Sequence, residues 1–100
     1  MNAFDILGDP VRRRVLELLA DGEQAAGEIG AVIQGEFGIS QPAVSQHLRV
    51  LREAGLVTER REGTRRFYRA RPEGLDDVRA FLDEFWADKL EGLKREVERG

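Results

Sequence analysis

The chain contains no cysteine, one histidine and no long apolar run, and each shortage removes a class of protein. Without cysteine, disulfide bonds and thiolate metal sites are excluded. No apolar stretch approaches the roughly 20 residues of a membrane span, and no signal-peptide pattern opens the sequence. One hundred residues allow a modest core and little room for a deep active-site cleft. We therefore expect a single small domain over residues 1–100, located in the cytoplasm.

The net charge of −3 hides an uneven distribution of charge along the chain. Residues 1–39 carry three basic and seven acidic side chains, a net −4, and residues 72–100 carry five basic and nine acidic ones, again −4. Residues 40–71 carry eight arginines against three acids, a net +5. A local positive field decides where phosphate docks, whatever the total charge. The middle third is therefore the expected nucleic-acid-binding segment.

Apolar spacing and capping signals predict two helices at the start of the chain. Residues 3–7 form a short helix candidate that ends at Gly8. Asp9 is the expected N-cap of a second helix, with Pro10 at its first position, where the missing N–H has no intrahelical partner to lose. The apolar stripe of this second helix consists of Val11, Val15, Leu18 and Leu19.

A third, weaker helical pattern covers about residues 25–33. Its weakness lies in Gly27 and Gly30, each of which costs about 1 kcal/mol in a helix relative to alanine. Residues 34–38 contain two further glycines, so we expect a turn there, with Phe37 placed in the core. This turn would join the third helix to the fourth.

The stretch from Ser40 to Gly55 carries the most information about function. Ser40 is the expected N-cap of a helix, and Gly55 fits the left-handed position after its last turn. The buried stripe is formed by Val44, Leu48 and Leu51. A rotation of about 100° per residue turns another set outward, namely Pro42, Gln46, Arg49 and Glu53, with Gln41 and Ser45 on one flank and His47 on the other. Gln and Arg can bind adenine and guanine edges, although an ordinary amphipathic surface helix has the same pattern.

An arginine-rich hairpin follows this helix. Residues 56–61 and 64–71 have the pattern of two strands, joined at Glu62–Gly63. Six arginines lie on this short ribbon: Arg60, Arg61, Arg65, Arg66, Arg69 and Arg71. Arginines on adjacent strands repel one another unless anions screen them, so phosphate is an attractive partner. The alternative is a charged edge strand that resists edge-to-edge pairing, but it does not require charges of one sign.

Residues from about 75 to 98 are expected to form one long amphipathic helix, after a break at 72–74. Its apolar side chains exceed what one face of a terminal helix needs in a monomer, and the first helix also has apolar residues that need burial. We therefore predict a dimer interface made by helices at about 3–8 and 75–98. The expected interface residues are Phe4, Leu7, Leu75, Val78, Phe81, Leu82, Phe85, Trp86, Leu90 and Leu93.

Three runs of residues resemble the ArsR/SmtB family of small bacterial winged helix-turn-helix transcription regulators. They are Asp9–Pro10 with Arg12–Arg14, Ser40–Leu48 and Leu51–Val57. The similarity covers nearly the whole chain and is densest over 39–70. It implies a mainly α fold with a small β-hairpin, a recognition helix at about 41–54, a wing at about 57–70 and a homodimer. It also implies that Gln41, Ser45, Gln46 and His47 occupy positions used for base-edge and nearby phosphate contacts.

Two departures from the family pattern bear on function. The turn at 34–38 is a few residues longer than the usual connection, which would alter the tilt of the recognition helix. Metal-sensing members carry a cysteine pair in the third helix, or Asp and His in the last one. Here residues 24–28 offer a single acid and the last helix has no histidine. Because a tight transition-metal site needs such ligands, we expect the non-metal-sensing branch, with no metal and no cofactor.

The sequence thus predicts a DNA-binding transcriptional regulator, most simply a homodimeric repressor on an inverted-repeat operator. The expected DNA contacts are Ser40, Gln41, Ser45, Gln46, His47, Arg49, Arg52, Arg61, Thr64, Arg65 and Arg66. A protein-interaction module with the same fold is the alternative, and it would show no salt-dependent duplex binding. An unidentified small-molecule effector is compatible with regulation, and no membrane partner is expected. No third group orients a base beside Ser40, Ser45 or His47, so we do not expect an enzyme.

Overall fold

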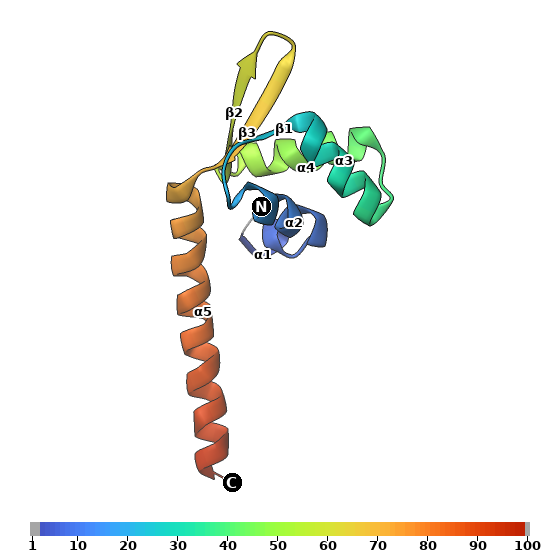
Figure 1. The fold of residues 1–100 in the computed structure, drawn as a ribbon. Coiled ribbons are helices and arrows are strands. Elements are labelled where there is room, and N and C mark those ends of the chain that lie inside the picture. Colours follow the sequence, from blue (N-terminus) through green and yellow to red (C-terminus); the bar gives the residue numbers. More distant parts are fainter. Residues whose placement is uncertain (1–2, 100) are drawn as a thin grey trace.

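The computed structural model of the chain describes residues 3–99, apart from the side chains of residues 3, 4, 78, 81, 82, 85, 86 and 94–99. A body of short helices lies at the base of a small antiparallel sheet, and the hairpin and the last helix leave this body in opposite directions (Figure 1). The elements are α1 (Ala3–Leu7), α2 (Pro10–Leu19), β1 (Gln24–Ala25), α3 (Ala26–Phe37), α4 (Gln41–Glu53), β2 (Val57–Glu62), β3 (Arg65–Ala70) and α5 (Pro72–Arg99).

The start of α2 has the predicted cap. Asp9 Oδ1 accepts hydrogen bonds from the backbone N–H groups of Val11 (2.8 Å) and Arg12 (3.3 Å), and Pro10 occupies the first helical position. These bonds satisfy donors that have no partner inside the helix. The buried residues of α2 are Val11, Val15 and Leu19, and Leu18 packs at the edge of the core.

α3 is longer than its sequence pattern predicts. It spans Ala26–Phe37 and ends at Gly38, whose φ of 66° is left-handed. The turn expected over 34–38 is therefore wrong, because residues 34–37 belong to the helix. Three residues, 38–40, separate α3 from α4. Because this connection is short, the structure gives no reason to expect an altered tilt of α4.

The extra turn of α3 is held by a contact with α2. Arg14 of α2 donates to both carboxylate oxygens of Glu36, at 2.9 Å and 3.0 Å. Gly35, which precedes Glu36, is unfavourable in a helix, and this bidentate pair adds a charge-assisted contact next to it. Phe37 was expected in the core but is 36% exposed, because the helix carries it past the core. Ile39 packs against the core in its place.

α4 begins and ends as predicted. Ser40 Oγ accepts from the N–H of Ala43 at 3.3 Å. At the other end, Gly55 has a φ of 76°, and its N–H donates to the Arg52 carbonyl at 3.0 Å. The N–H of Leu56 donates to the Leu51 carbonyl at 3.0 Å, which completes the Schellman motif. The predicted stripe of Val44, Leu48 and Leu51 is buried.

The sheet has three strands in the order β1-β3-β2, all antiparallel. β1, which the sequence pattern did not predict, pairs Gln24 with Tyr68 and Ala25 with Phe67. The hairpin pairs run from Val57–Ala70 to Glu62–Arg65, so the turn lies at 63–64, one residue later than expected. Gly63 adopts the left-handed φ of 62° that this turn requires.

α5 begins at Pro72, before the expected start at 75, because proline suits the first position of a helix. Its first turn lies against the end of α4, where Gly74 is buried on the carbonyl group of Gly55. Leu75 and Leu7 pack partly against the core, whereas Leu90 and Leu93 are 60% and 57% exposed. The other predicted interface side chains, Phe4, Val78, Phe81, Leu82, Phe85 and Trp86, lie outside the described part. Among the helices as described, none has the length and apolar character to cross a membrane.

Candidate nucleic-acid interface

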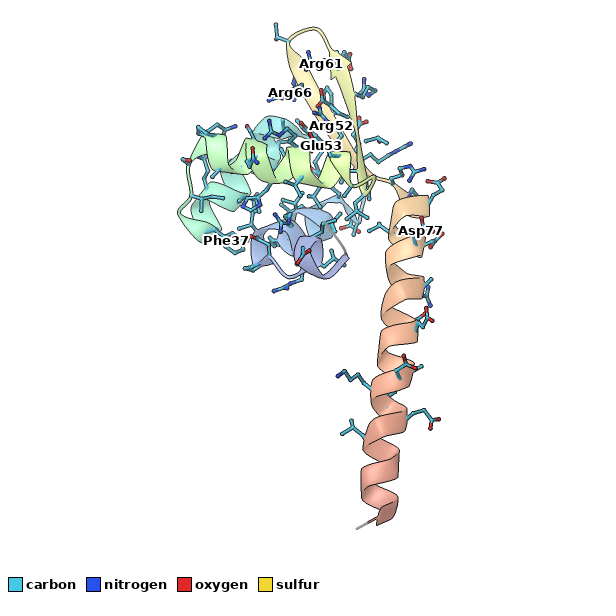
Figure 2. The ribbon with its side chains drawn as sticks, turned by 180° about the vertical axis from the view of Figure 1, so that it is seen from behind. Phe37, Arg52, Glu53, Arg61, Arg66 and Asp77 are labelled. Atoms are coloured by element: carbon cyan, nitrogen blue, oxygen red, sulfur yellow. The ribbon has the colours of Figure 1, made fainter. Side chains whose placement is uncertain are left out.

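A groove of about 310 Å³ lies between α4 and the β2–β3 hairpin, and we call it the recognition groove. It is lined by Pro42, Ser45, Gln46, Arg49, Arg52, Arg66 and Tyr68. The helical period brings four of the predicted contacts to this face of α4, and the sheet register adds Arg66 from β3. Figure 2 shows Arg52 at the end of α4 beside the base of the hairpin, and Arg66 farther out along it.

Two exposed side chains of α4 are organised before any ligand arrives. Arg49 Nη2 donates to Gln46 Oε1 at 2.7 Å. This bond leaves the amide N–H groups of Gln46 and four guanidinium donors of Arg49 for other partners. Ser45 lies beside them, half-buried. The arrangement presents short polar groups and hydrogen-bond donors along one helix face, which suits base edges in a major groove.

The sheet register assigns the wing arginines to two faces. Alternation places Arg61 with Arg66, its cross-strand partner, on the face toward the recognition groove. On the opposite face, the guanidinium carbons of Arg60 and Arg65 lie 4.6 Å and 4.9 Å from the centre of the Phe67 ring. Both distances are within the range of cation–π contacts.

A second hollow of about 440 Å³ adjoins the groove. The start of α3, Gln41 of α4 and the tip of the hairpin line it, the residues being Ala25, Ala26, Gly27, Glu28, Gln41, Thr64, Arg65 and Arg66. Arg66 therefore belongs to both hollows. The Gln41 amide lies over Gly30 of α3, where a β-carbon would come within 3.1 Å of Gln41 Oε1. The absence of a side chain at Gly30 is what leaves room for Gln41.

Three predicted contacts line neither hollow. Ser40 is exposed and uses its hydroxyl oxygen as the cap of α4, so its O–H remains free to donate. His47 is half-buried, and its Nδ1 is buried with no hydrogen-bond partner among the described residues. Arg61 lies near the tip of the wing, across from Arg66, and its Nε donates to Glu59 at 2.9 Å. The DNA roles of these residues stay predictions.

Carboxylates already screen several of the arginines. Arg60 donates to Glu23 at 2.8 Å and to Glu62 at 2.8 Å, which raises the pKa of its guanidinium. The same contact with Arg60 lowers the pKa of Glu23. Arg66, in contrast, has no carboxylate partner within the described part of the chain. The positive charge left for a phosphate in the groove is therefore that of Arg66 and of Arg49, whose described side-chain bond is to the neutral amide of Gln46.

Glu59 and Tyr68 lie at this candidate interface, and the sequence reasoning missed both of them. The Glu59 carboxylate accepts from Arg61, Tyr68 and Arg52, and its pKa is lowered chiefly by the bond from Arg61. Burial, followed by the Glu59 charge, raises the pKa of Tyr68. Strand alternation could have placed Glu59, Arg61 and Tyr68 on one face, but it could not show the approach of Arg52. Across residues 3–99 as described, no group of three His, Cys, Asp or Glu is placed to hold a metal ion.

Comparison with known proteins agrees with this architecture. Residues 7–60 match a family described as "Helix-turn-helix domain". The HTH-type transcriptional regulator Rv2034 of Mycobacterium tuberculosis is 43% identical over 96 residues, which are 96% of this chain and 86% of the relative. The transcriptional repressor SdpR of Bacillus subtilis is 36% identical over 76% of this chain and 80% of its own length.

Solved structures extend the similarity to the whole fold. A possible transcriptional regulator for arsenical resistance superimposes with a TM-score of 0.81 at 44% identity, covering 96% of both chains. The winged helix-turn-helix DNA-binding domain of Mb0332 from Mycobacterium bovis, a homodimer and a possible ArsR-family regulator, has a TM-score of 0.63 at 32% identity, covering 87% of this chain and 76% of that one. The chain therefore belongs to the ArsR-type winged helix-turn-helix transcriptional regulators.

Proposed function

We propose that this chain is a homodimeric repressor that places α4 in the major groove of an inverted-repeat operator and the β2–β3 hairpin on the flanking backbone. The observation that carries the proposal is the recognition groove. It joins groups suited to base edges, Gln46 and Arg49, to the unpaired cation of Arg66. Base contacts specify sequence, whereas phosphate contacts fix register and supply affinity. A regulator of this kind acts where the chromosome lies, in the cytoplasm.

Different observations support the homodimer in this proposal. Leu90 and Leu93 of α5 leave large apolar side chains exposed, and the Mb0332 domain is a homodimer. Two-fold symmetry would place two α4 helices in successive major grooves, about 34–36 Å apart. Selection of bound duplexes from a random pool tests this directly. Recovery of a palindrome is the expected result, and recovery of no preferred sequence would contradict sequence-specific repression.

Two substitutions separate the roles within the groove. Gln46→Ala should relax specificity at one operator position, since a bidentate base contact is worth about 1–3 kcal/mol of discrimination. Arg66→Ala should weaken binding to all duplexes alike and reduce the slope of log affinity against log salt by about 1. Titrations of operator and random duplex between about 50 and 200 mM salt measure both effects.

Arg69→Ala is the matched control for Arg66→Ala. Arg69 lies on the same strand and carries the same charge, but it lines a different hollow with Thr58 and Arg71 on the outer face. Its substitution should change the salt slope less than Arg66→Ala does. Equal effects of the two substitutions would show that general charge, and not the recognition groove, attracts the duplex. Failure of the wild-type protein to bind any duplex would favour a protein-interaction module.

A further inference from the structure

Glu59 is a carboxylate placed at the base of the wing with little access to water. Its side chain is 8% exposed. Oε2 accepts from Arg52 Nη1 at 2.6 Å and from the Tyr68 hydroxyl at 3.1 Å, and Oε1 accepts from Arg61 Nε at 2.9 Å. One side chain thus joins three elements: α4 through Arg52, β2 through Arg61 and β3 through Tyr68.

Core stability does not explain this carboxylate. Taking charges out of water is costly, and a buried ion pair often stabilises a protein no more than apolar residues of similar size. Strand alternation puts Glu59 on the same face as buried Val57. An apolar residue would extend that core without desolvating any charge. The position instead suits a residue whose role is to orient the side chains that it binds.

The groups held by Glu59 belong to the proposed DNA interface. Arg52 lines the recognition groove, and Arg61 lies on the groove face directly across from Arg66. A guanidinium has five N–H donors, and Glu59 uses one from each arginine. Most donors therefore remain for phosphate, in an orientation fixed by the carboxylate. At the same time, its negative charge cancels one of the two positive charges beside it.

We propose that Glu59 is a positioning residue that determines specificity by aligning Arg52 and Arg61 toward the duplex while restraining their attraction for random DNA. This inference rests on the proposed DNA interface. Alignment favours the duplex geometry in which α4 is seated, because the two arginines can then meet phosphates without reorganising. Partial neutralisation lowers the affinity for every other duplex, where phosphate charge supplies essentially all of the binding.

Glu59→Gln tests both parts. A glutamine has one carbonyl oxygen, so it cannot accept from both arginines through separate oxygens, and it adds one net positive charge. We expect random duplex to bind more tightly, with a salt slope steeper by about 0.9. We expect the ratio of operator to random affinity to fall about tenfold, the scale of one charge-assisted hydrogen bond.

Two further variants make the result decisive. Glu62→Gln removes the same charge from the same strand, but Glu62 is 69% exposed and binds Arg60 on the outer face. It should leave the affinity ratio within about twofold, since no groove contact changes. Glu59→Asp keeps the charge and withdraws the carboxylate by one methylene. It should lower the ratio without steepening the salt slope, and it decides the question if circular dichroism shows that Glu59→Gln does not fold.

Wild-type ratios in both Glu59 variants would overturn the proposal, and so would an effect of Glu62→Gln equal to that of Glu59→Gln. These results would leave the proposed function standing, because the wild-type protein would still bind its operator. Absence of duplex binding by the wild-type protein would instead overturn the proposed function, and the role of Glu59 with it.

Discussion

At the level of single residues, the partner of each arginine decides what that arginine can do. Arg12 and Arg13 donate to the main-chain oxygens at the end of α1, and Arg14 is paired with Glu36 of α3. These three arginines therefore join helices to one another. Arg66 has no such carboxylate within the described part of the chain and faces the recognition groove. Local charge located the basic segment, but the pairing shows that Arg52, Arg60 and Arg61 within it are already bound to carboxylates.

The Glu59 cluster also predicts how stability depends on pH. The pKa of Glu59 is lowered by the bond from Arg61, so folding favours its charged form. Its contribution to stability is full above the ordinary carboxyl value of 4.5 and is lost as pH falls through the lower folded value. We expect the free energy of unfolding by urea to decline below that pH less steeply in Glu59→Gln than in the wild-type protein. Parallel curves would show that Glu59 does not contribute to acid sensitivity.

Gly30 provides a residue-scale test of how Gln41 is placed. Alanine in a helix interior stabilises by up to about 1 kcal/mol relative to glycine, but at Gly30 its β-carbon would crowd Gln41 Oε1 at 3.1 Å. We expect Gly30→Ala to keep or raise the melting temperature while operator affinity falls several-fold. Gly35→Ala is the control, since nothing lies within 4 Å of its β-carbon in the same helix. It should raise stability and leave affinity unchanged, and equal affinities of the two variants would refute the role of Gly30.

At the level of elements, local signals predicted the capped starts of α2 and α4, but they did not predict the end of α3. The caps at Asp9 and Ser40 act on the residues next to them, so the sequence alone locates them. The last turn of α3 carries Glu36, which pairs with Arg14, 22 residues away in sequence. Helix propensity counts Gly35 as unfavourable, and it takes no account of a contact between residues far apart in the sequence. Residues 34–37, predicted as a turn, are therefore helical in a part of the chain that also has a long-range contact.

The same limit applies to the sheet and to the candidate site. β1 has two residues and is a strand only because it pairs with β3. Two residues are too few to show an alternating apolar pattern in the sequence. The arginine cluster was predictable, but which members face α4 depends on the register of the hairpin. Arg65 and Arg66 are neighbours in sequence, yet Arg65 stacks on Phe67 and Arg66 lines the recognition groove.

The junction of α4 with α5 supplies an element-scale prediction. A β-carbon on Gly74 would collide with the Gly55 carbonyl oxygen and lie 2.9 Å from its carbon. We expect Gly74→Ala to destabilise by about 1–3 kcal/mol as α5 is displaced and to change the half-site spacing preferred in duplex titrations. Gly92→Ala in the same helix meets nothing within 4 Å and should stabilise slightly. Unchanged stability and unchanged spacing in Gly74→Ala would contradict a tight junction.

At the level of the whole molecule, the chain is more extended than a compact domain of the same length. The radius of gyration is 16.7 Å and the extents are 62 × 29 × 24 Å. A compact chain of this length would have a radius near 13 Å. The difference comes from α5, whose 28 residues make a rod of about 42 Å that projects from the body (Figure 1). Leu90 and Leu93 are exposed along this rod, and in the proposed homodimer a second α5 would be the surface that covers them.

That partner surface can be tested with Leu90→Ser and Leu93→Ser together, which remove apolar area without changing charge. We expect monomers by sedimentation, and affinity for a palindromic duplex lower by about 10²–10⁴ because the two half-sites are no longer linked. Asp88→Ser is the control, since the helical period turns Asp88 about 160° away from Leu90. It should remain dimeric and bind normally. A doubly substituted protein that still sediments as a dimer would show that copies meet through another surface. In the wild-type protein, a melting temperature that rises with concentration would show that copies associate, because association stabilises the folded state by mass action, and loss of this rise in the double variant would assign the association to α5.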